Sequence, residues 1–274
     1  MLQQTRVAAV VPFYERFLAA FPNPAALAAA PEERVLTMWS GLGYYSRARN
    51  LQKAARQVID LGGFPRNHAA ILELAGIGDY TAAAIASIAF RSPHAAVDGN
   101  VRRVMVRLLN DDRADVPAAA AQLLDRKDPG RWNQAVMELG AVICTPRDPH
   151  CRACPIAKHC AAHAAGTQTS LPSKRRKPEP ERLERTLLVV KDRGRILLTE
   201  SSRVKGFWDL PESESASGVK LGEFRHTITF RHYRFTVRES RTAPNARWFA
   251  IAKLHEIPLS TTAKKALHAT SIAP

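Results

Sequence analysis

The sequence has no cysteine outside one short window. Its four cysteines lie between positions 144 and 160 of a 274-residue chain, with the spacing Cys-x6-Cys-x2-Cys-x5-Cys. A disulfide framework would spread its cysteines over the whole fold, so the pattern excludes that class of secreted domain. Four thiols in one tight loop instead predict a metal centre, on Cys144, Cys151, Cys154 and Cys160.

Zinc and a [4Fe-4S] cluster both accept four cysteine thiolates. Zinc sites commonly combine two Cys-x2-Cys pairs separated by a long spacer, whereas this loop has one such pair. The three unequal gaps therefore favour the cluster, with zinc as the alternative.

The sequence also lacks long apolar runs and is poor in acidic residues. No stretch of about 18 apolar residues is present, and the N-terminus has no signal-peptide pattern, so we expect an intracellular, cytoplasmic protein without membrane spans. Forty Lys and Arg against 25 Asp and Glu give a net charge of +15. This balance favours a polyanionic partner, nucleic acid first and an anionic membrane surface second.

Residues 1 to 165 are rich in Ala, and their apolar residues recur with the period of a helix, which predicts an almost entirely helical domain. The first such stretch runs from Gln4 to Phe21 and has no Ser, Thr, Asp or Asn cap before it. Its apolar stripe consists of Val7, Val10, Val11, Tyr14, Phe17, Leu18 and Phe21.

Residues 166–182 contain three prolines and the basic block Lys174–Lys177, which predicts a linker. Beyond it, Thr186–Val190 and Arg195–Thr199 are typical of strands around a hairpin turn at 192–194, and 226–237 alternates like a third strand. Thr261–Ala269 is typical of a short helix. We therefore expect a multidomain protein, with a mainly α domain at 1–165 and a smaller α/β domain at 183–274.

Two short stretches of the helical part can carry chemistry. In "LAGIGDYTA", Gly76 and Gly78 separate two predicted helices, and such a hairpin exposes backbone N–H groups that bind phosphate without reading sequence. An ordinary helix–helix turn is the alternative. In "AAVDGNVRR", Asp98 stands before a predicted helix and is, by itself, most simply an N-cap.

A helix-hairpin-helix, an Asp shortly after it and the cysteine loop together resemble the endonuclease III superfamily of base-excision DNA glycosylases. The stretches "MLQQT", "GLGYYSRARNL", "VDGNVRR", "MELGAVICTPRDPHC" and "GFWDLP" are similar to the MutY family within it. That family removes adenine mispaired with 8-oxoguanine or guanine by flipping it out of double-stranded DNA. The resemblance implies a [4Fe-4S] cofactor, a monomer and an enzyme associated with the bacterial nucleoid.

The resemblance also implies roles for the residues around Asp98. Asp98 would stabilise the positive charge that develops on the sugar, and Tyr80 and Asn100 would hold Asp98 and the sugar in place. Glu138 would contact the adenine or its catalytic water; an exposed helix carboxylate is the alternative. Glycosylases that also cleave the strand need a Lys amine where this chain has Tyr80, so the resemblance implies base removal without strand cleavage.

Further residues would contact the DNA or read the opposite strand. Gln4 and Tyr44 would wedge into the duplex beside the lesion, with Thr5 and Leu42 lining the same place, and Gly41 and Gly43 favour an exposed loop tip over core packing for Tyr44. The C-terminal part resembles a Nudix-like domain that checks for 8-oxoguanine. It lacks the Glu-rich magnesium helix of Nudix hydrolases, and Thr229 stands in the loop that would meet the purine.

In three places the sequence departs from the family pattern. Ala75 replaces a Pro in the hairpin, Phe230 replaces a His in the C-terminal loop, and the family's proton-donating Glu would precede Met1. Loss of a general acid costs about 10²- to 10⁴-fold in rate, so we expect impaired excision by this sequence. The alternatives are a protein that binds the lesion without turnover and, less favoured, a glycosylase-lyase of the endonuclease III type.

Overall fold

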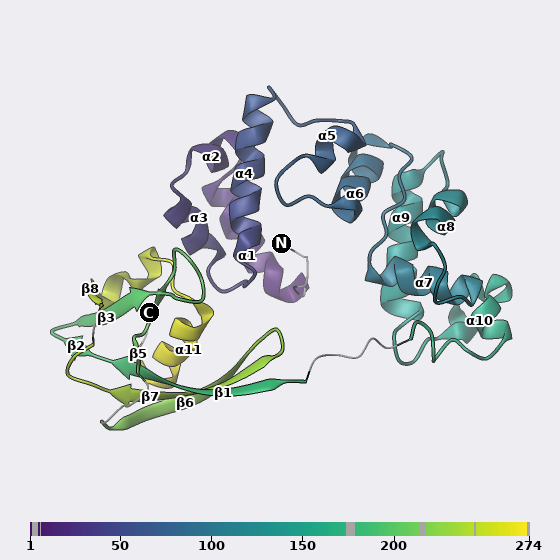
Figure 1. Cartoon of the computed structure of the whole chain (residues 1–274). Coiled ribbons are helices and arrows are strands. Elements are labelled where there is room, and N and C mark those ends of the chain that lie inside the picture. The colour runs from purple at the N-terminus through teal and green to yellow at the C-terminus, as the bar shows by residue number, and fades with distance from the viewer. Residues whose placement is uncertain (2–4, 6, 174–178, 214–217, 244, 273–274) are drawn as a thin grey trace. The chain divides into compact units, whose positions relative to one another are not determined.

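The computed structural model describes residues 1, 5, 7–173, 179–213, 218–243 and 245–272 (Figure 1). Up to residue 165 the described residues form helices and short helical turns, which confirms the predicted helical part. The helices are α1 (Val7–Ala20), α2 (Pro24–Ala29), α3 (Glu32–Trp39), α4 (Ser46–Asp60), α5 (His68–Leu72), α6 (Asp79–Phe90), α7 (Gly99–Leu109), α8 (Val116–Leu123), α9 (Pro129–Glu138), the π-turn η1 (Leu139–Ile143), the 3₁₀ turns η2 (Cys151–Ala153) and η3 (Ala157–His159), and α10 (Ala161–Ala164).

The chain divides into two compact units. The first combines Met1–Ile59 with Lys177–Pro274, and the second comprises Asp60–Arg176. The division at 165 and 182, made from the order of the sequence, stays a prediction, and the basic block Lys174–Lys177 lies outside the described residues. No helix in the described part of the chain is long and apolar enough to cross a bilayer.

Helix α1 buries only part of the apolar stripe predicted for it. Val10 and Phe17 pack into the core of the first unit, as does Phe21 directly after the helix. The other stripe residues are exposed, at 65% for Val7, 46% for Val11, 53% for Tyr14 and 43% for Leu18. The sequence therefore contains two apolar stripes on α1, and the described core covers one of them.

The C-terminal part of the first unit contains two small sheets. Its elements are β1 (Glu181–Val189), β2 (Lys191–Asp192), β3 (Arg195–Glu200), β4 (Trp208–Asp209), β5 (Glu212–Ser213), β6 (Lys220–Ile228), β7 (Arg231–Glu239), β8 (Arg247–Ala250), the 3₁₀ segment η4 (Ile251–Glu256) and α11 (Thr261–Ala269). One sheet has the order β5-β1-β7-β6, and the other has the order β2-β3-β4 with β8 paired to β3.

The predicted turn at 192–194, between β2 and β3, and the helix at Thr261–Ala269 are confirmed. The predicted strand at 186–190 lies, up to Val189, in β1, which pairs with β5 and β7 in the other sheet. The single strand expected at 226–237 is wrong, because β6 and β7 are antiparallel strands that meet at Thr229 and Phe230. Thr229 turns the chain with φ = +55°, although no Gly or Asn marks the turn. Alternation at period two is the same in both strands, so it cannot reveal the reversal.

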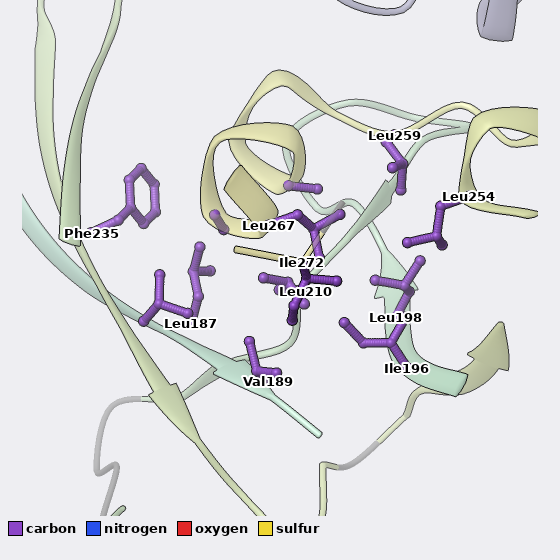
Figure 2. Close-up of a cluster of buried hydrophobic side chains, with 13 residues drawn as sticks. Leu187, Val189, Ile196, Leu198, Leu210, Phe235, Leu254, Leu259, Leu267 and Ile272 are labelled. Atoms are coloured by element: carbon purple, nitrogen blue, oxygen red, sulfur yellow. The ribbon is translucent and has the colours of Figure 1, made fainter. Parts of the chain in front are cut away.

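The core of this C-terminal part lies between the sheets and α11. Figure 2 shows Leu187, Val189, Ile196, Leu198 and Phe235 from the strands gathered with Leu267 of α11. Helix α11 lies so close to β6 that a Cβ on Gly222 would stand 2.6 Å from the Ala269 carbonyl oxygen. A glycine at this position is what permits the contact.

The turn "GFWDLP" joins this C-terminal part to the helices α1–α4 of the same unit. Phe207 is fully buried, and its ring lies 4.0 Å from that of Tyr45, inside the cluster that includes Leu36 and Trp39. Gly206 has φ = +74°, and a Cβ there would stand 3.0 Å from Arg49 Nη2. The turn is therefore a packing element between two segments far apart in the sequence.

Replacing Phe207 with Ala should lower the free energy of unfolding by about 3–5 kcal/mol, because it opens a cavity in this core. Phe230→Ala is the matched control, since the Phe230 side chain is 42% exposed and its loss should cost less than about 1 kcal/mol. Urea unfolding followed by circular dichroism measures both. Equal costs for the two variants would contradict the packing role of Phe207.

Candidate active site and cysteine loop

Helices α5 and α6 of the second unit form the predicted helical hairpin (Figure 1). Asn67 caps α5 by accepting a 2.8 Å bond from the Ala70 amide, and the chain then reverses at Gly76 with φ = +77°. Within the described residues, no side chain caps the start of α6 after Gly78. The hairpin thus directs the N-terminal end of α6 outward beside two glycines, as a phosphate-binding turn requires.

Asp98 caps the next helix, α7, as its sequence context indicated. Its Oδ1 accepts a 2.7 Å hydrogen bond from the Val101 amide. Its Oδ2 accepts a 3.1 Å hydrogen bond from Asn100 Nδ2. Both oxygens are therefore oriented, while the half-buried carboxylate stays reachable from solvent. These two hydrogen bonds fix the direction of the carboxylate in the protein itself.

Tyr80, in the first turn of α6, lies near this carboxylate. Its hydroxyl donates a 3.4 Å hydrogen bond to Met137 Sδ. Partial burial, and secondarily the negative charge of Asp98, raise the pKa of the Tyr80 phenol above 10.0. The phenol is thus a neutral hydrogen-bond donor at physiological pH. Glu138 follows Met137 at the end of α9 and is exposed.

Arg103 connects this site to the cysteine loop. Its guanidinium is buried and donates hydrogen bonds to Asn100 Oδ1 at 2.8 Å, to the Gly140 carbonyl at 2.6 Å and to the Cys144 carbonyl at 2.8 Å. Gly140 lies so close to Asn100 that a Cβ on it would be 2.7 Å from the Asn100 Cβ. Asn100, which orients Asp98, is therefore held by Arg103 and by the close approach of η1. Arg103 in turn is bonded to the carbonyl of the first cysteine.

Arg107, one turn further along α7, holds the cysteine loop directly. It is 1% exposed, and its Nη1 lies 3.2 Å from Cys144 Sγ and 2.7 Å from the Thr145 carbonyl oxygen. Its own carbonyl oxygen accepts a 3.3 Å contact from Cys160 Sγ. Arg107 therefore places a buried positive charge in direct contact with the first cysteine sulfur.

The four cysteines are free thiols that line one cavity, together with Arg107 and apolar side chains from α7 and η3. Burial, followed by the neighbouring sulfurs of Cys144, Cys160 and Cys154, raises the pKa of the Cys151 thiol. Among the described residues, no group of three or more His, Cys, Asp or Glu side chains is arranged to hold a single metal ion. All four cysteines lie in the lining of this one cavity.

The predicted DNA-contacting residues near the N-terminus belong to the first unit. Gln4 lies outside the described residues, and the Thr5 hydroxyl accepts a 3.3 Å hydrogen bond from Arg47 Nη2. Leu42 is 8% exposed and packs in the core, whereas Tyr44 is 55% exposed, as its flanking glycines indicated. Thr229 is exposed in the β6–β7 turn and bonds to its own neighbour, the Ile228 carbonyl oxygen.

Sequence reasoning missed three residues that organise the site: Arg103, Arg107 and Asn133. Asn133 is fully buried, accepts from the Ala96 amide at 2.8 Å and donates to the His94 carbonyl at 2.9 Å, which fixes the segment leading to Asp98. The arginines carried a readable signal, because they stand four residues apart on the face of α7 that is otherwise apolar. Asn133 had no comparable signal in the sequence.

Arg103→Met should destabilise the protein by roughly 2–4 kcal/mol, because it leaves the Gly140 carbonyl and Asn100 Oδ1 without their buried donor and removes one of the two donors to the Cys144 carbonyl. Arg102→Met is the matched control: Arg102 precedes it on α7, is exposed, and its loss should cost less than about 0.5 kcal/mol. Thermal unfolding of both variants tests this. A similar melting temperature for the two would show that the network contributes little.

Comparison with known proteins agrees with this geometry. Residues 1–128 match the HhH-GPD superfamily of base excision DNA repair proteins. The chain is 48% identical over 174 residues to the rat adenine DNA glycosylase, covering 60% of this chain and 34% of that protein. It is 35% identical over 260 residues to the Arabidopsis thaliana adenine DNA glycosylase, covering 77% of this chain and 41% of the relative. It thus spans only about a third to two fifths of these relatives.

Among solved structures, a thermostable thymine-DNA glycosylase superimposes with a TM-score of 0.56 at 30% sequence identity, covering 60% of this chain and 80% of that one. The region that matches the family model, residues 1–128, contains the helical hairpin and the Asp98 helix. The chain belongs to the HhH-GPD superfamily of base excision DNA repair proteins.

Proposed function

We propose that this protein is an adenine DNA glycosylase that removes adenine opposite 8-oxoguanine or guanine from double-stranded DNA. The observation that carries the proposal is the arrangement at the start of α7, where Asn100 Nδ2 and the Val101 amide orient Asp98 beside Tyr80. The choice of adenine as the excised base follows from the relatives that are named adenine DNA glycosylases. The net charge of +15 suits a DNA partner.

Asp98 would act on the sugar of a flipped nucleotide. Breaking the N-glycosidic bond leaves positive charge on the sugar ring, and a carboxylate held in a fixed direction stabilises it, ionically or through a transient covalent bond. Asn100 Nδ2, already bonded to Asp98 Oδ2, prevents rotation of the carboxylate. The Tyr80 hydroxyl would bond to the sugar or to Asp98, and Glu138 to the adenine or the attacking water.

Tyr80 also bears on the type of reaction. A phenol forms no Schiff base with an opened sugar, and the amine of a lyase would stand at this position. The supported activity is hydrolysis of the base without strand cleavage. The amides beside Gly76 and Gly78 would bind backbone phosphates, and Tyr44 and Gln4 would fill the space vacated by the adenine, with Thr5 and Leu42 lining it.

The cysteine loop would hold a [4Fe-4S] cluster. A single tetrahedral zinc ion with Zn–S bonds near 2.3 Å needs its sulfurs about 3.8 Å apart, whereas a cluster needs thiolates around a cavity. Cys144, Cys151, Cys154 and Cys160 line such a cavity, and Arg107 supplies a buried positive charge beside it. We assign the cluster no step in the reaction; its role here is to fix the loop that holds Arg103.

The C-terminal part would read the opposite strand as a Nudix-like domain, with Thr229 toward the purine. Its turn Gly206–Pro211 packs on the helices of the same unit. The sequence after the turn lacks the spacing of a Glu-rich magnesium-binding helix, which suits binding over hydrolysis. The protein would act as a monomer in the cytoplasm, at the nucleoid. The domain limits 1–165, 166–182 and 183–274 remain part of this proposal.

Asp98→Asn should reduce single-turnover release of adenine from an adenine:8-oxoguanine duplex by at least about 10²-fold. Fold and DNA affinity should be retained, because Asn caps helices as well as Asp does. Asp115→Asn is the matched control, since Asp115 caps α8 in the same way, through a 3.2 Å bond from the Ala118 amide. Equal rates for the two variants would contradict the role of Asp98.

The wild-type chain distinguishes the candidate functions in the same assay. Adenine release without strand cleavage supports the glycosylase. Specific binding of the lesion duplex without release, measured on the same samples, would favour a lesion-binding protein. Cleavage that is trapped by borohydride would favour a lyase of the endonuclease III type.

Anaerobically purified protein should contain about four iron atoms per chain and absorb broadly in the visible range. Cys154→Ser should lower both, because it removes one of the four thiolates. Elemental analysis and an absorption spectrum measure this. One zinc per chain with negligible iron would contradict the cluster.

A further inference from the structure

Residues 40–45 of the first unit form a loop, here the tyrosine loop, with an unusual backbone. Three of its residues have positive φ: Gly41 at +113°, Gly43 at +69° and Tyr44 at +48°. A tyrosine rarely adopts the left-handed region, so surrounding contacts must hold it there. The Tyr44 side chain is 55% exposed, so the contacts act mainly on the backbone of the loop.

One set of contacts comes from the helices on either side of the loop. Trp39 Nε1, at the end of α3, donates a 3.2 Å hydrogen bond to the Gly43 carbonyl oxygen. Arg47, in α4, donates to the same oxygen at 3.3 Å and to the Tyr44 carbonyl oxygen at 3.4 Å, and its guanidinium lies 5.2 Å from the centre of the Tyr44 ring. These contacts hold the tip of the loop.

A second set comes from α11 and from Leu259 just before it, more than 200 residues further along the chain. Lys264 Nζ donates a 2.9 Å hydrogen bond to the Ser40 carbonyl, and Ser40 Oγ donates at 2.6 Å to the Leu259 carbonyl. The Tyr45 hydroxyl lies 2.9 Å from Thr261 Oγ1. Ser40 and Tyr45 are 5% and 8% exposed, so both ends of the loop are anchored in a buried interface.

Helix α11 also holds the sheet that ends in the Thr229 turn. Its last residue, Ala269, packs against Gly222 of β6, and Lys265 Nζ donates a 3.3 Å hydrogen bond to the Arg225 carbonyl of β6. Strand β6 runs directly into Thr229. The same helix therefore contacts both the loop that carries Tyr44 and the strand that leads to Thr229.

We propose that α11 positions Tyr44 for insertion into DNA, with Lys264 as the principal positioning residue, and so couples the tyrosine loop to the sheet that carries Thr229. This inference rests on the proposed function, in which Tyr44 enters the duplex beside the flipped adenine. Lys264 touches no reacting group. It acts by fixing the Ser40 carbonyl, one residue before the strained backbone begins.

The first test needs no DNA. Hydrogen exchange of the amides at 41–45 should be at least about fivefold faster in Lys264→Met, because the loop loses the half-buried donor to its Ser40 carbonyl. Lys264→Arg keeps a donor and should restore most of the protection. Lys253→Met, an exposed lysine of η4 in the same C-terminal part, should leave the exchange unchanged. Unchanged exchange in Lys264→Met would overturn the positioning role.

The second test uses the full chain and a duplex with 2-aminopurine next to an adenine opposite 8-oxoguanine, in which fluorescence reports unstacking. Lys264→Met should reduce the fluorescence rise on binding about fivefold or more, which is the lower range of typical coupling between sites. In a Tyr44→Ala background the same substitution should have no further effect, because Lys264 acts through Tyr44. An equal reduction in both backgrounds would overturn the coupling to Tyr44 and indicate a general structural role.

The two tests separate failure of the inference from failure of the proposed function. If wild-type protein gives no unstacking but Lys264→Met speeds exchange, the loop is positioned by α11 and its assigned use on DNA is wrong. If wild-type protein unstacks the duplex and Lys264→Met does so equally, the function stands and the inference fails.

Discussion

The second unit depends on two buried arginines of α7 and the carbonyl oxygens that they satisfy. A guanidinium with almost no exposure is tolerated only where its N–H groups meet acceptors, and Arg103 and Arg107 meet six carbonyl oxygens and one thiol between them. These acceptors belong to η1, the cysteine loop and the segment after α10. The arginines thus bond the irregular segments around the cysteines to α7.

The same network sets the direction of the candidate catalytic carboxylate. Arg103 holds Asn100 Oδ1, and Asn100 holds Asp98 Oδ2, while the first turn of α7 holds Oδ1. Asp98 is thus both the cap of its helix and the candidate reactive group. The Val101 amide that stabilises the cap therefore also fixes the carboxylate in one direction, as stabilising a developing positive charge requires.

The first unit relies on a different constraint, the insertion of Phe207 among the α1–α4 side chains. The turn that carries it is fixed from the other side by Asp209, which is 2% exposed, bonds to Ser260 and pairs with Arg203 at 3.3 Å. Burial raises the pKa of Asp209, and the Ser201 and Ser260 hydroxyls and Arg203 oppose that rise. The short motif Gly206–Pro211 is therefore a buried contact between two segments that are distant in the sequence.

The sequence by itself determined the features that depend on local chemistry. The cysteine spacing, the glycine pair at 76 and 78, the Asp98 cap, the exposure of Tyr44 and the helix at Thr261–Ala269 follow from neighbouring residues, so spacing and period reveal them. The tertiary structure alone decided which stripe of α1 is buried, where β6 turns at Thr229, and that Asn133, Lys264 and Phe207 join distant segments. Those outcomes depend on contacts across tens to hundreds of residues, and hydrogen bonding and burial between such positions leave no periodic mark in the chain.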